Sequence, residues 1–198
     1  AFRPAFPYED RFRGDLIHPQ FWPENYDYAG KRVAIIGSGA TAVTLLPAMA
    51  KTAAHVTQIQ RTPSYVLPRP KRDGLAKFLM RFLPAKCTHA IVRWKNTRLQ
   101  RYFYLFCQRY PTYAKRVIRR AGSKLLPKDY PFDIHFNPPY NPWDQRLCAA
   151  PDGDFFEALR NGSATIETGE IERFENNGVR MKSGALVVAD TVIIATGL

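Results

Sequence analysis

Short apolar runs alternate with glycine-rich or polar connections in the first third of the chain, and this pattern predicts two strands around a helix. Residues 33–36, Val-Ala-Ile-Ile, form a β-branched run typical of a parallel strand buried on both faces. Residues 40–53 are rich in alanine and leucine, which favours a helix packed on a sheet, with an irregularity at Pro47. Residues 55–60 read as a second strand, so the segment predicts a right-handed β-α-β unit.

The middle of the chain has helical periodicity between two stretches that resemble loops. Residues 63–73 are rich in proline and basic residues, which predicts a loop. Apolar residues then recur at helical spacing in three stretches, so we expect a helical insertion at about residues 74–126. Residues 127–154 contain a proline- and asparagine-rich segment and are predicted to form a long irregular loop, a kind of segment that is more often functional than structural.

The last third of the chain has the pattern of a short helix followed by β-strands. Residues 155–160 are expected to be helical, and turn signals separate four short apolar runs between residues 164 and 188, which predicts an antiparallel meander. Residues 190–195 form a final apolar run that returns to the parallel sheet. The predicted fold class is therefore α/β: a Rossmann-like three-layer nucleotide-binding domain with a parallel sheet, an antiparallel β-meander and a helical insertion.

Composition places the chain among ordinary cytoplasmic domains. Of 198 residues, 45% are hydrophobic and 23% are charged, and neither a signal peptide nor a membrane-spanning run is present in the sequence. The three cysteines are isolated, so we expect small buried apolar groups and neither a disulfide nor a metal site. Residues 1–30 resemble a proline-rich inter-domain linker and residues 31–198 a nucleotide-binding domain; both ends are abrupt, which indicates a domain of a longer polypeptide.

Positive charge is concentrated in one segment. Residues 69–128 hold 17 Lys or Arg and one acid, Asp73, whereas the whole chain has a net charge of +12. These cations are interpreted as solvated helix faces whose field attracts an anionic cofactor. Contact with an anionic membrane surface is the alternative, since basic residues are interleaved with aromatic ones such as Trp94 and Phe103. No recognisable reader module accompanies the charge, so nucleic acid is not an expected partner.

A Gly-x-Gly-x-x-Ala turn between the first strand and the helix indicates a dinucleotide site. The first glycine permits a tight turn, the second lets the backbone approach a pyrophosphate, and the helix amino terminus offers N–H groups to the anion. An alanine at the third position is a known variant of this fingerprint. The predicted cofactor-binding residues of the turn are Gly37, Ser38, Gly39, Ala40, Thr41 and Ala42.

The residues after the second strand indicate which nucleotide is bound. An NAD site needs an acid about 20 residues after the turn, whereas the 2′-phosphate of NADPH needs a cation there. Arg61 followed by Thr62 stands at this position. A guanidinium fork beside a hydroxyl suits a phosphate, and we expect no carboxylate nearby that would repel it. NADPH is therefore the predicted cofactor, with Arg61 as a solvated loop cation the alternative.

The segment before the glycine turn carries a second motif. Phe12, Gly14, His18, Trp22 and Pro23 form F-x-G-x-x-x-H-x-x-x-W-P, which resembles the fingerprint of Baeyer-Villiger monooxygenases; the related flavin-containing monooxygenases carry another aromatic residue in place of tryptophan. The resemblance implies that this segment links a FAD-binding domain to an NADPH-binding domain, and that the histidine shapes the cofactor arrangement. A surface histidine in a connector is the alternative.

Further matches extend the resemblance. Residues 60–63 look like the family's 2′-phosphate loop, and residues 190–197 look like its strand that ends in Ala-Thr-Gly, which assigns Thr196 and Gly197 to cofactor binding. Gln145 and Arg146 look like the stretch with the active-site arginine, so Arg146 inherits that role. The family often has lysine immediately before this arginine, and Gln145 stands there instead. Pairing of Arg146 with a neighbouring aspartate is the alternative.

The resemblance implies a function for the whole. It predicts the NADPH-binding domain of a flavin-dependent Baeyer-Villiger-type monooxygenase that inserts one oxygen atom from O2 into a small hydrophobic ketone, giving an ester or lactone. FAD would be bound mainly by a FAD-binding domain of the same full-length polypeptide, and the 198-residue chain alone would be inactive. The alternatives are an N- or S-oxygenating flavin-containing monooxygenase, and a non-catalytic nucleotide- or membrane-binding module.

Overall fold

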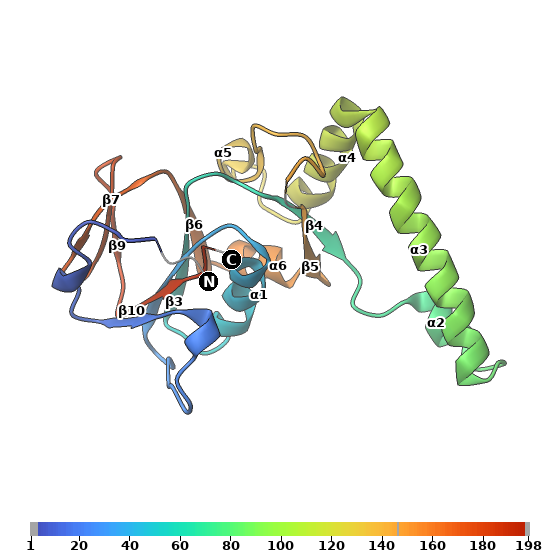
Figure 1. Cartoon of the computed structure of the whole chain (residues 1–198), viewed down its shortest axis with the longest axis horizontal. Helices are drawn as coiled ribbons and strands as arrows, with labels where there is room; N and C mark the ends of the chain where they lie inside the picture. The colour runs from blue at the N-terminus through green and yellow to red at the C-terminus, as the bar shows by residue number, and fades with distance from the viewer. Residues whose placement is uncertain (1–3, 146, 197–198) are drawn as a thin grey trace.

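A five-stranded parallel sheet forms the centre of the protein (Figure 1). The structure, a computed structural model, describes residues 4–145 and 147–196. The strand order is β1-β10-β2-β3-β6, and each neighbouring pair is parallel. The strands of this sheet are β1 (Asp15–Ile17), β2 (Arg32–Ile36), β3 (His55–Gln60), β6 (Ala164–Thr168) and β10 (Thr191–Ile194). Because all of them run in one direction, their carboxyl ends share one edge.

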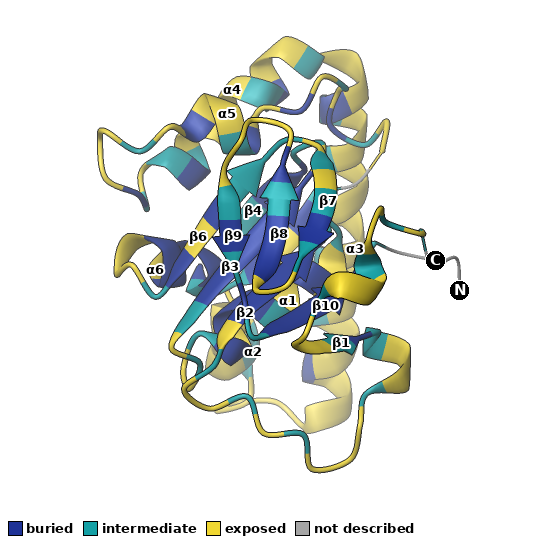
Figure 2. Ribbon diagram, turned by 90° about the vertical axis from the view of Figure 1, so that its left-hand side faces the viewer, coloured by how far each residue is buried: buried dark blue, intermediate teal, exposed yellow. Residues whose placement is uncertain are grey.

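Helices cover one face of this sheet and a β-meander covers the other. The helical layer consists of α1 (Ala40–Met49) and α6 (Asp154–Arg160); the meander consists of β7 (Ile171–Glu175), β8 (Gly178–Met181) and β9 (Leu186–Val188). Side chains alternate along β2, so Val33 and Ile35 join the helix-side core while Ala34 and Ile36 join the meander-side core. Most strand residues are dark blue in Figure 2. The three-layer α/β prediction is confirmed.

The meander has three strands, and the predicted fourth strand belongs elsewhere. Residues 164–168 form β6, which pairs parallel with β3. The reason lies in α6, which precedes β6 and returns the chain to the amino edge of the sheet, so the next strand runs parallel. Turn signals at the ends of a strand do not report its direction, and the four-stranded meander was wrong for that reason. Pro47 does not end α1, which continues to Met49.

Two segments that were predicted to be loops contain strands. β4 (Tyr65–Arg69) and β5 (Leu147–Pro151) pair parallel as a separate two-stranded sheet. Pro68 hid β4 from the sequence pattern, but a two-stranded sheet has a free edge on each strand and tolerates proline. The helix α5 (Phe132–Phe136) lies in the second of these segments, and its two terminal phenylalanines join the core beside Phe155 and Phe156.

The predicted helical insertion consists of α2 (Gly74–Leu79), α3 (Ala85–Arg109) and α4 (Pro111–Ser123). α4 packs on β4, with Ala114 and Ile118 buried, whereas α2 and α3 extend away from the sheet in Figure 1. We call α2 and α3, residues 74–109, the arm. Only Thr88 and Cys107 are buried among the 25 residues of α3. Across the described part of the chain, no helix combines the length and apolar character needed to cross a membrane.

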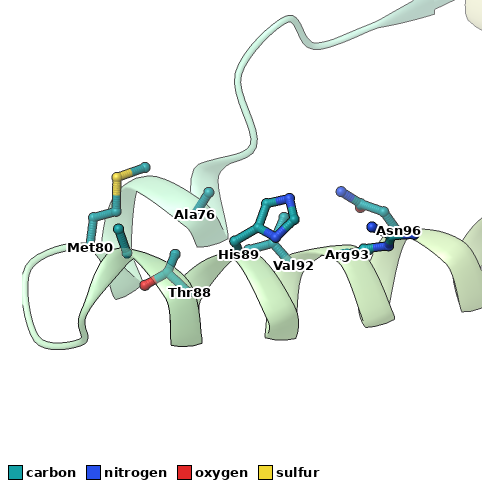
Figure 3. A pocket seen from close by; sticks show the side chains of 8 residues that line it. Ala76, Met80, Thr88, His89, Val92, Arg93 and Asn96 are labelled. Carbon is teal, nitrogen blue, oxygen red and sulfur yellow. The ribbon is translucent and has the colours of Figure 1, made fainter.

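Asp73 links the two helices of the arm. Asp73 caps the amino terminus of α2 and also pairs with Lys95 and Asn96 on α3. Beside this link lies a groove of about 400 Å³ between α2 and α3 (Figure 3). Its lining residues are Ala76, Met80, Ala85, Thr88, His89, Val92, Arg93 and Asn96. Cys107 and Cys148 are buried as expected, but Cys87 on the arm is exposed, so that expectation was wrong for this residue.

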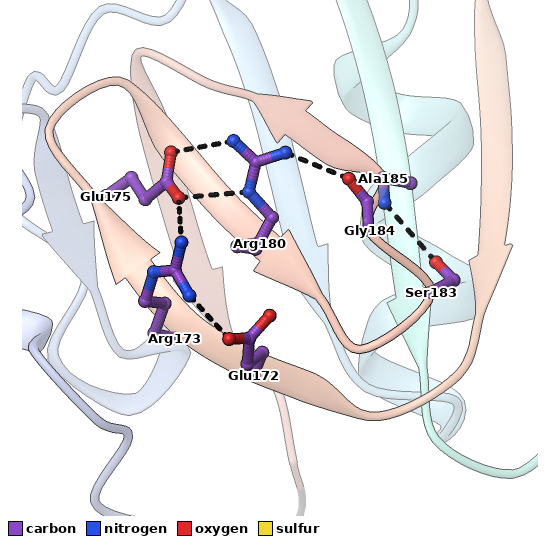
Figure 4. Close-up of polar contacts among 7 residues, drawn as sticks. All are labelled: Glu172, Arg173, Glu175, Arg180, Ser183, Gly184 and Ala185. Atoms are coloured by element: carbon purple, nitrogen blue, oxygen red, sulfur yellow. Dashed lines mark hydrogen bonds and ion pairs between the residues drawn. The ribbon is translucent and has the colours of Figure 1, made fainter.

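The outer surface of the meander carries an ion network. Glu175 accepts hydrogen bonds from Arg180 and Arg173, and Arg173 also pairs with Glu172 (Figure 4). Phe174 and Val179 lie on the inner side of the same strands and are fully buried. The meander is thus half-solvated, as expected for an antiparallel sheet that covers one face of a core.

Candidate functional site: the carboxyl edge of the parallel sheet

The predicted cofactor residues are far apart in the sequence but gather at one edge of the sheet. The glycine turn follows β2, Arg61 and Thr62 follow β3, and Thr196 follows β10. β2 lies between β3 and β10, so the chain leaves the centre of the sheet in opposite directions at this point. Nucleotides bind in the crevice at such a topological switch point in open α/β sheets. The fold therefore brings these residues together where a ligand site is expected.

Gly37 occupies a position that no other residue can fill without strain. Its φ is +143°, and a Cβ atom there would lie 2.2 Å from the carbonyl oxygen of Ala195, directly after the neighbouring strand β10. The Gly37 N–H donates to the carbonyl of Ile59, at 2.8 Å. The first glycine of the motif thus allows the turn to fit between β3 and β10.

The amino terminus of α1 is open to an anion. Gly39 is the N-cap, its extended backbone leads into the helix, and the first turn contains no acidic residue. Ala40 and Thr41 are exposed there, whereas Ala42 is fully buried against the sheet. The positive end of the helix dipole is therefore uncompensated at its solvent side, while the small third residue of the motif lets the helix pack closely.

Two glutamines on β3, which are not among the predicted site residues, support the edge. The Gln58 amide donates to the carbonyl of Gly37, at 2.9 Å, so β3 fixes the peptide of the glycine turn. The Gln60 amide donates to the hydroxyl of Thr168 and to the carbonyl of His135, at 2.9 Å each. Both side chains are at least 97% buried. Polar residues inside a buried strand were the available signal, because such side chains need partners.

His135 lies in the same network. Its Nδ1 lies 2.8 Å from the Thr168 hydroxyl, and burial lowers the pKa of its imidazole below the usual 6.5. The contact ties α5 to the end of β6, beside the loop that carries Arg61. Nothing in the local sequence predicts it, because its partners are more than 30 residues away.

Arg61 is exposed and Thr62 is half-buried, so both side chains can reach a ligand. The sequence suggested that no carboxylate stands near Arg61, and the structure corrects this. Glu170 follows Gly169, whose N–H donates to the carbonyl of Gln60, at 2.9 Å. Glu170 pairs with Lys182, and hydrogen bonding to Lys182, with a smaller contribution from Arg61, lowers the pKa of Glu170. Two cations and one carboxylate therefore surround the end of β3.

His18 also follows a strand of the same sheet. It comes directly after β1, and its Nδ1 accepts a hydrogen bond from the N–H of Gln20, at 3.2 Å. The neutral imidazole therefore carries its proton on Nε2. A cavity of about 230 Å³ opens beside it, lined by Leu16, Ile17, His18, Phe21, Pro23 and Ile194.

The other residues of the F-x-G-x-x-x-H-x-x-x-W-P motif have packing roles. A Cβ on Gly14 would lie 2.3 Å from the carbonyl oxygen of Asp190, so only glycine fits there. The Phe12 ring packs edge-on against Phe174 of the meander. Trp22 makes edge contacts with Tyr26 and Tyr28. The segment was predicted to be an extended linker, but it supplies β1 to the edge of the parallel sheet.

The strand that follows the predicted Gln145-Arg146 stretch reaches the same edge. Gln145 is exposed, and Arg146 and Gly197 lie outside the described residues. Cys148, two residues after Arg146, places its thiol 4.0 Å from the carbonyl of Ser38 in the glycine turn. The structure therefore brings Cys148 of β5 (Leu147–Pro151) beside the turn, although β5 was not foreseen.

Several buried polar atoms at this edge have no hydrogen-bond partner within the described residues. The Gln58 Oε1, Ser64 Oγ and Thr196 Oγ1 atoms are buried and have no hydrogen-bond partner among residues 4–145 and 147–196. Buried polar atoms normally have partners, and these three follow or lie in the strands that end at this edge. A cradle without room for a Cβ, an open helix terminus and unpaired polar atoms fit a phosphorylated dinucleotide.

The fold is Rossmann-like, and the carboxyl edge of its parallel sheet is the candidate dinucleotide site. A family model described as flavin-binding monooxygenase-like matches residues 2–107, more than half of the chain. The chain belongs to this flavin-binding monooxygenase-like family, which confirms the resemblance seen in its motifs.

Relatives extend the match over the whole chain. It is 46% identical over 199 residues to FAD-containing monooxygenase EthA of Mycobacterium tuberculosis, covering 100% of this chain and 41% of that protein. It is 48% identical to the probable FAD-binding monooxygenase AlmA of an Acinetobacter species, covering 100% of this chain and 40% of that protein. The chain thus spans about two fifths of the length of these curated relatives.

Solved structures show the same fold. Cyclohexanone monooxygenase from Rhodococcus sp. Phi1 bound to NADP+ superimposes with a TM-score of 0.74 at 22% identity, covering 100% of this chain and 44% of that one. OTEMO in complex with FAD and NADP gives a TM-score of 0.76 at 18% identity, covering 100% and 45%. At these identities the likeness concerns the fold alone.

Proposed function

We propose that the carboxyl edge of the parallel sheet binds NADPH. The observation that carries this proposal is the placement of Arg61 and Thr62 after β3, next to a glycine turn that opens the uncompensated amino terminus of α1. The N–H groups of residues 37–42 would hold the pyrophosphate. The Arg61 guanidinium and the Thr62 hydroxyl would hold the 2′-phosphate through charge-assisted hydrogen bonds. Gln145, Thr196 and Gly197 would complete the nucleotide contacts.

We further propose that the chain is the NADPH-binding domain of a Baeyer-Villiger-type monooxygenase. Family membership supports a flavin-dependent monooxygenase, and Trp22-Pro23 at the end of the fingerprint favours the Baeyer-Villiger group. The whole protein would insert one oxygen atom from O2 into a small hydrophobic ketone to give an ester or lactone. N- or S-oxygenation is the competing reaction within the family.

The proposed domain organisation follows from the same reasoning. Residues 1–30 would join the two nucleotide-binding parts, and residues 31–198, with the insertion at about 74–126, would form the NADPH-binding part. The sequence contains one strand–glycine turn–helix unit. FAD would therefore be bound mainly by a FAD-binding domain of the same full-length polypeptide.

When bound, the two cofactors supply hydride transfer and activation of oxygen. The residues of this chain bind, orient and stabilise charge. His18, at the end of β1 with its proton on Nε2, would position the cofactors through that N–H. Arg146 would place a fixed cation where negative charge develops on the reacting oxygen, an effect typically worth about 3 kcal/mol in preorganised sites. Loss of this cation should slow oxygen transfer.

Replacement of Arg61 tests the cofactor assignment. The Arg61→Ala variant should bind NADPH at least about tenfold more weakly and NADH about equally well, because the loss concerns the 2′-phosphate alone. Arg160→Ala is the matched control, since Arg160 is exposed at the end of α6, near the opposite edge of the sheet. Equal losses for both nucleotides in fluorescence titrations would refute the role of Arg61.

Turnover assays test the reaction. The 198-residue chain should oxygenate no substrate, and the full-length protein should convert ketones to esters or lactones in an NADPH-dependent manner. Oxidation of amines or sulfides without ketone conversion would show that the Baeyer-Villiger assignment is wrong while leaving the nucleotide site intact.

A further inference from the structure

One side of α3 exposes a continuous set of large apolar and basic side chains. The positions 91, 94, 98, 101, 102 and 105 recur at intervals of three and four residues and therefore share one side of the helix. Cys107, which is buried, and Val92 and Asn96, which line the groove towards α2, lie on the opposite side. We call this set the outer face of α3; it consists of Ile91, Trp94, Arg98, Arg101, Tyr102 and Leu105.

The apolar members of the outer face are far more exposed than packing residues. Trp94 is 62% exposed and Tyr102 is 60% exposed, and Ile91 and Leu105 are each more than 40% exposed. A single exposed apolar residue is ordinary, but a contiguous group marks an interaction surface. In Figure 2 most of α3 is yellow, which agrees with these values. The outer face therefore needs an occupant other than water.

The charge around this face has one sign. Residues 74–128 contain 14 Lys or Arg and neither Asp nor Glu. Arg98 lies over the Trp94 ring, with its guanidinium carbon 5.2 Å from the ring centre. Its charge is thus held within the apolar patch. A partner for the outer face must therefore accept aromatic rings and guanidinium groups at the same depth.

The charge of this face distinguishes between occupants. Tryptophan, tyrosine and arginine also occur in protein interfaces, but no acidic residue stands between positions 74 and 128, so a protein that covers Arg98 and Arg101 would need a matching acidic surface. A second copy of the chain would place two strongly cationic faces together. An anionic bilayer accepts both groups, because tryptophan, tyrosine and aliphatic side chains enter the headgroup boundary while arginines extend to the phosphates.

We propose that the arm docks on an anionic membrane surface through the outer face of α3. The helix lies in the plane of the interface without crossing it, in agreement with its polar composition. The sheet domain would then remain in water beside the lipid, and the proposal does not depend on NADPH binding. Its physical basis is charge complementarity combined with burial of the exposed aromatic and aliphatic side chains.

Vesicle co-sedimentation of the 198-residue chain tests this surface. The chain should bind vesicles with about 30% phosphatidylserine at least tenfold more tightly than pure phosphatidylcholine vesicles, since each basic residue near an anionic surface contributes about fivefold. Raising NaCl from about 0.05 to about 0.5 M should weaken binding, because the charges are solvent-exposed. Equal binding to both lipids, or to neither, would overturn the proposal.

Paired variants localise the contact. Arg98→Glu/Arg101→Glu should lose at least tenfold in binding to the anionic vesicles. The control Lys51→Glu/Arg160→Glu has the same charge change at exposed positions outside the arm and should lose less than threefold.

The apolar contribution is tested in the same way. Trp94→Ala/Tyr102→Ala should also reduce binding, in contrast to Tyr8→Ala/Ile134→Ala, whose side chains are comparably exposed elsewhere. Circular dichroism would test whether each variant is folded. Equal losses in test and control variants, or concentration-dependent dimerisation that the outer-face variants abolish, would contradict the lipid assignment.

Discussion

Strand β2 buries four of its five residues, whereas the 25-residue helix α3 buries two. Strand β2 is covered by α1 on one face and by the meander on the other, and its neighbours fix its register. The arm contacts the rest of the chain near the carboxyl end of α3, where Tyr104 packs on Trp143, and Asp73 links its two helices. Packing on both faces of the sheet therefore fixes the positions of the residues at its carboxyl edge, whereas the arm exposes most of its side chains to solvent.

Removal of a large side chain should give the largest difference between the sheet and the arm in the free energy of unfolding. Phe156 is completely buried among other phenylalanines, and Phe82 on the arm is 70% exposed. Phe156→Ala should lower the free energy of unfolding by about 3–5 kcal/mol through lost burial and a residual cavity. Phe82→Ala should change it by less than about 0.5 kcal/mol. Urea denaturation measures both changes in unfolding free energy. Comparable losses would contradict the claim that packing stabilises the sheet much more than the arm.

A pair of glycines gives the next largest difference. Gly37→Ala introduces a Cβ 2.2 Å from a backbone oxygen at a φ of +143°, so we expect a loss of about 3 kcal/mol in unfolding free energy and of nucleotide binding. Gly74→Ala starts α2 with open space around its Cβ. That variant should be neutral or slightly stabilising. A tolerated alanine at position 37 would mean that the turn is not held between β3 and β10.

One carboxylate in the sheet and one in the arm allow the acid stability of the two regions to be compared. Hydrogen bonding to Arg32 in the sheet holds the pKa of Asp190 at about 2, and hydrogen bonding to Lys95 in the arm holds the pKa of Asp73 at about 2. Since both pKa values are depressed, the stabilisation is present above about pH 4 and is lost as the pH falls towards 2. Asp190→Asn should cost less than about 1 kcal/mol at pH 7, because the pair is partly solvated.

In Asp73→Asn we expect α2 to fray while the sheet keeps its stability. Hydrogen exchange of α2 and of β2 distinguishes these outcomes for the two variants. Loss of protection in β2 after the Asp73 substitution would show that the arm and the sheet are energetically coupled. That result would contradict the claim that the sheet is stable independently of the arm.

The smallest expected effect concerns nucleotide preference. Glu170 stands near Arg61 and would repel a 2′-phosphate, so Glu170→Gln should increase the preference for NADPH over NADH by about threefold. Glu172→Gln is the control, because Glu172 pairs with Arg173 in the meander network. An unchanged ratio in calorimetric titrations would mean that the carboxylate does not reach the bound phosphate.

The parallel core could be predicted because its signals are local. The β-branched run of β2, the glycine turn and the composition of α1 follow one another within 20 residues, and the helices of the insertion have clear periodicity. β4 and β5 could not be predicted in this way, because they pair across about 80 residues and contain proline. The direction of β6 was missed for a related reason, since it depends on α6 and not on the strand itself.

The candidate site shows the same division. Gly37 and Arg61 belong to local motifs, so their types and spacing identified them. Gln58, His135 and Glu170 act through contacts with distant segments, and only the folded chain reveals their partners. Buried glutamines in a strand were the one visible signal of this group.

Amide chemical-shift mapping of the 198-residue chain with NADP+ tests the central claim most directly. The predicted result is that shifts concentrate in residues 37–42, Arg61 and Thr62, and Thr196, with the amides of α2 and α3 unchanged. NAD+ should reproduce the shifts of the glycine turn and not those of Arg61. Shifts confined to the arm, or no shifts at millimolar nucleotide, would contradict the assignment of the carboxyl edge as a nucleotide site.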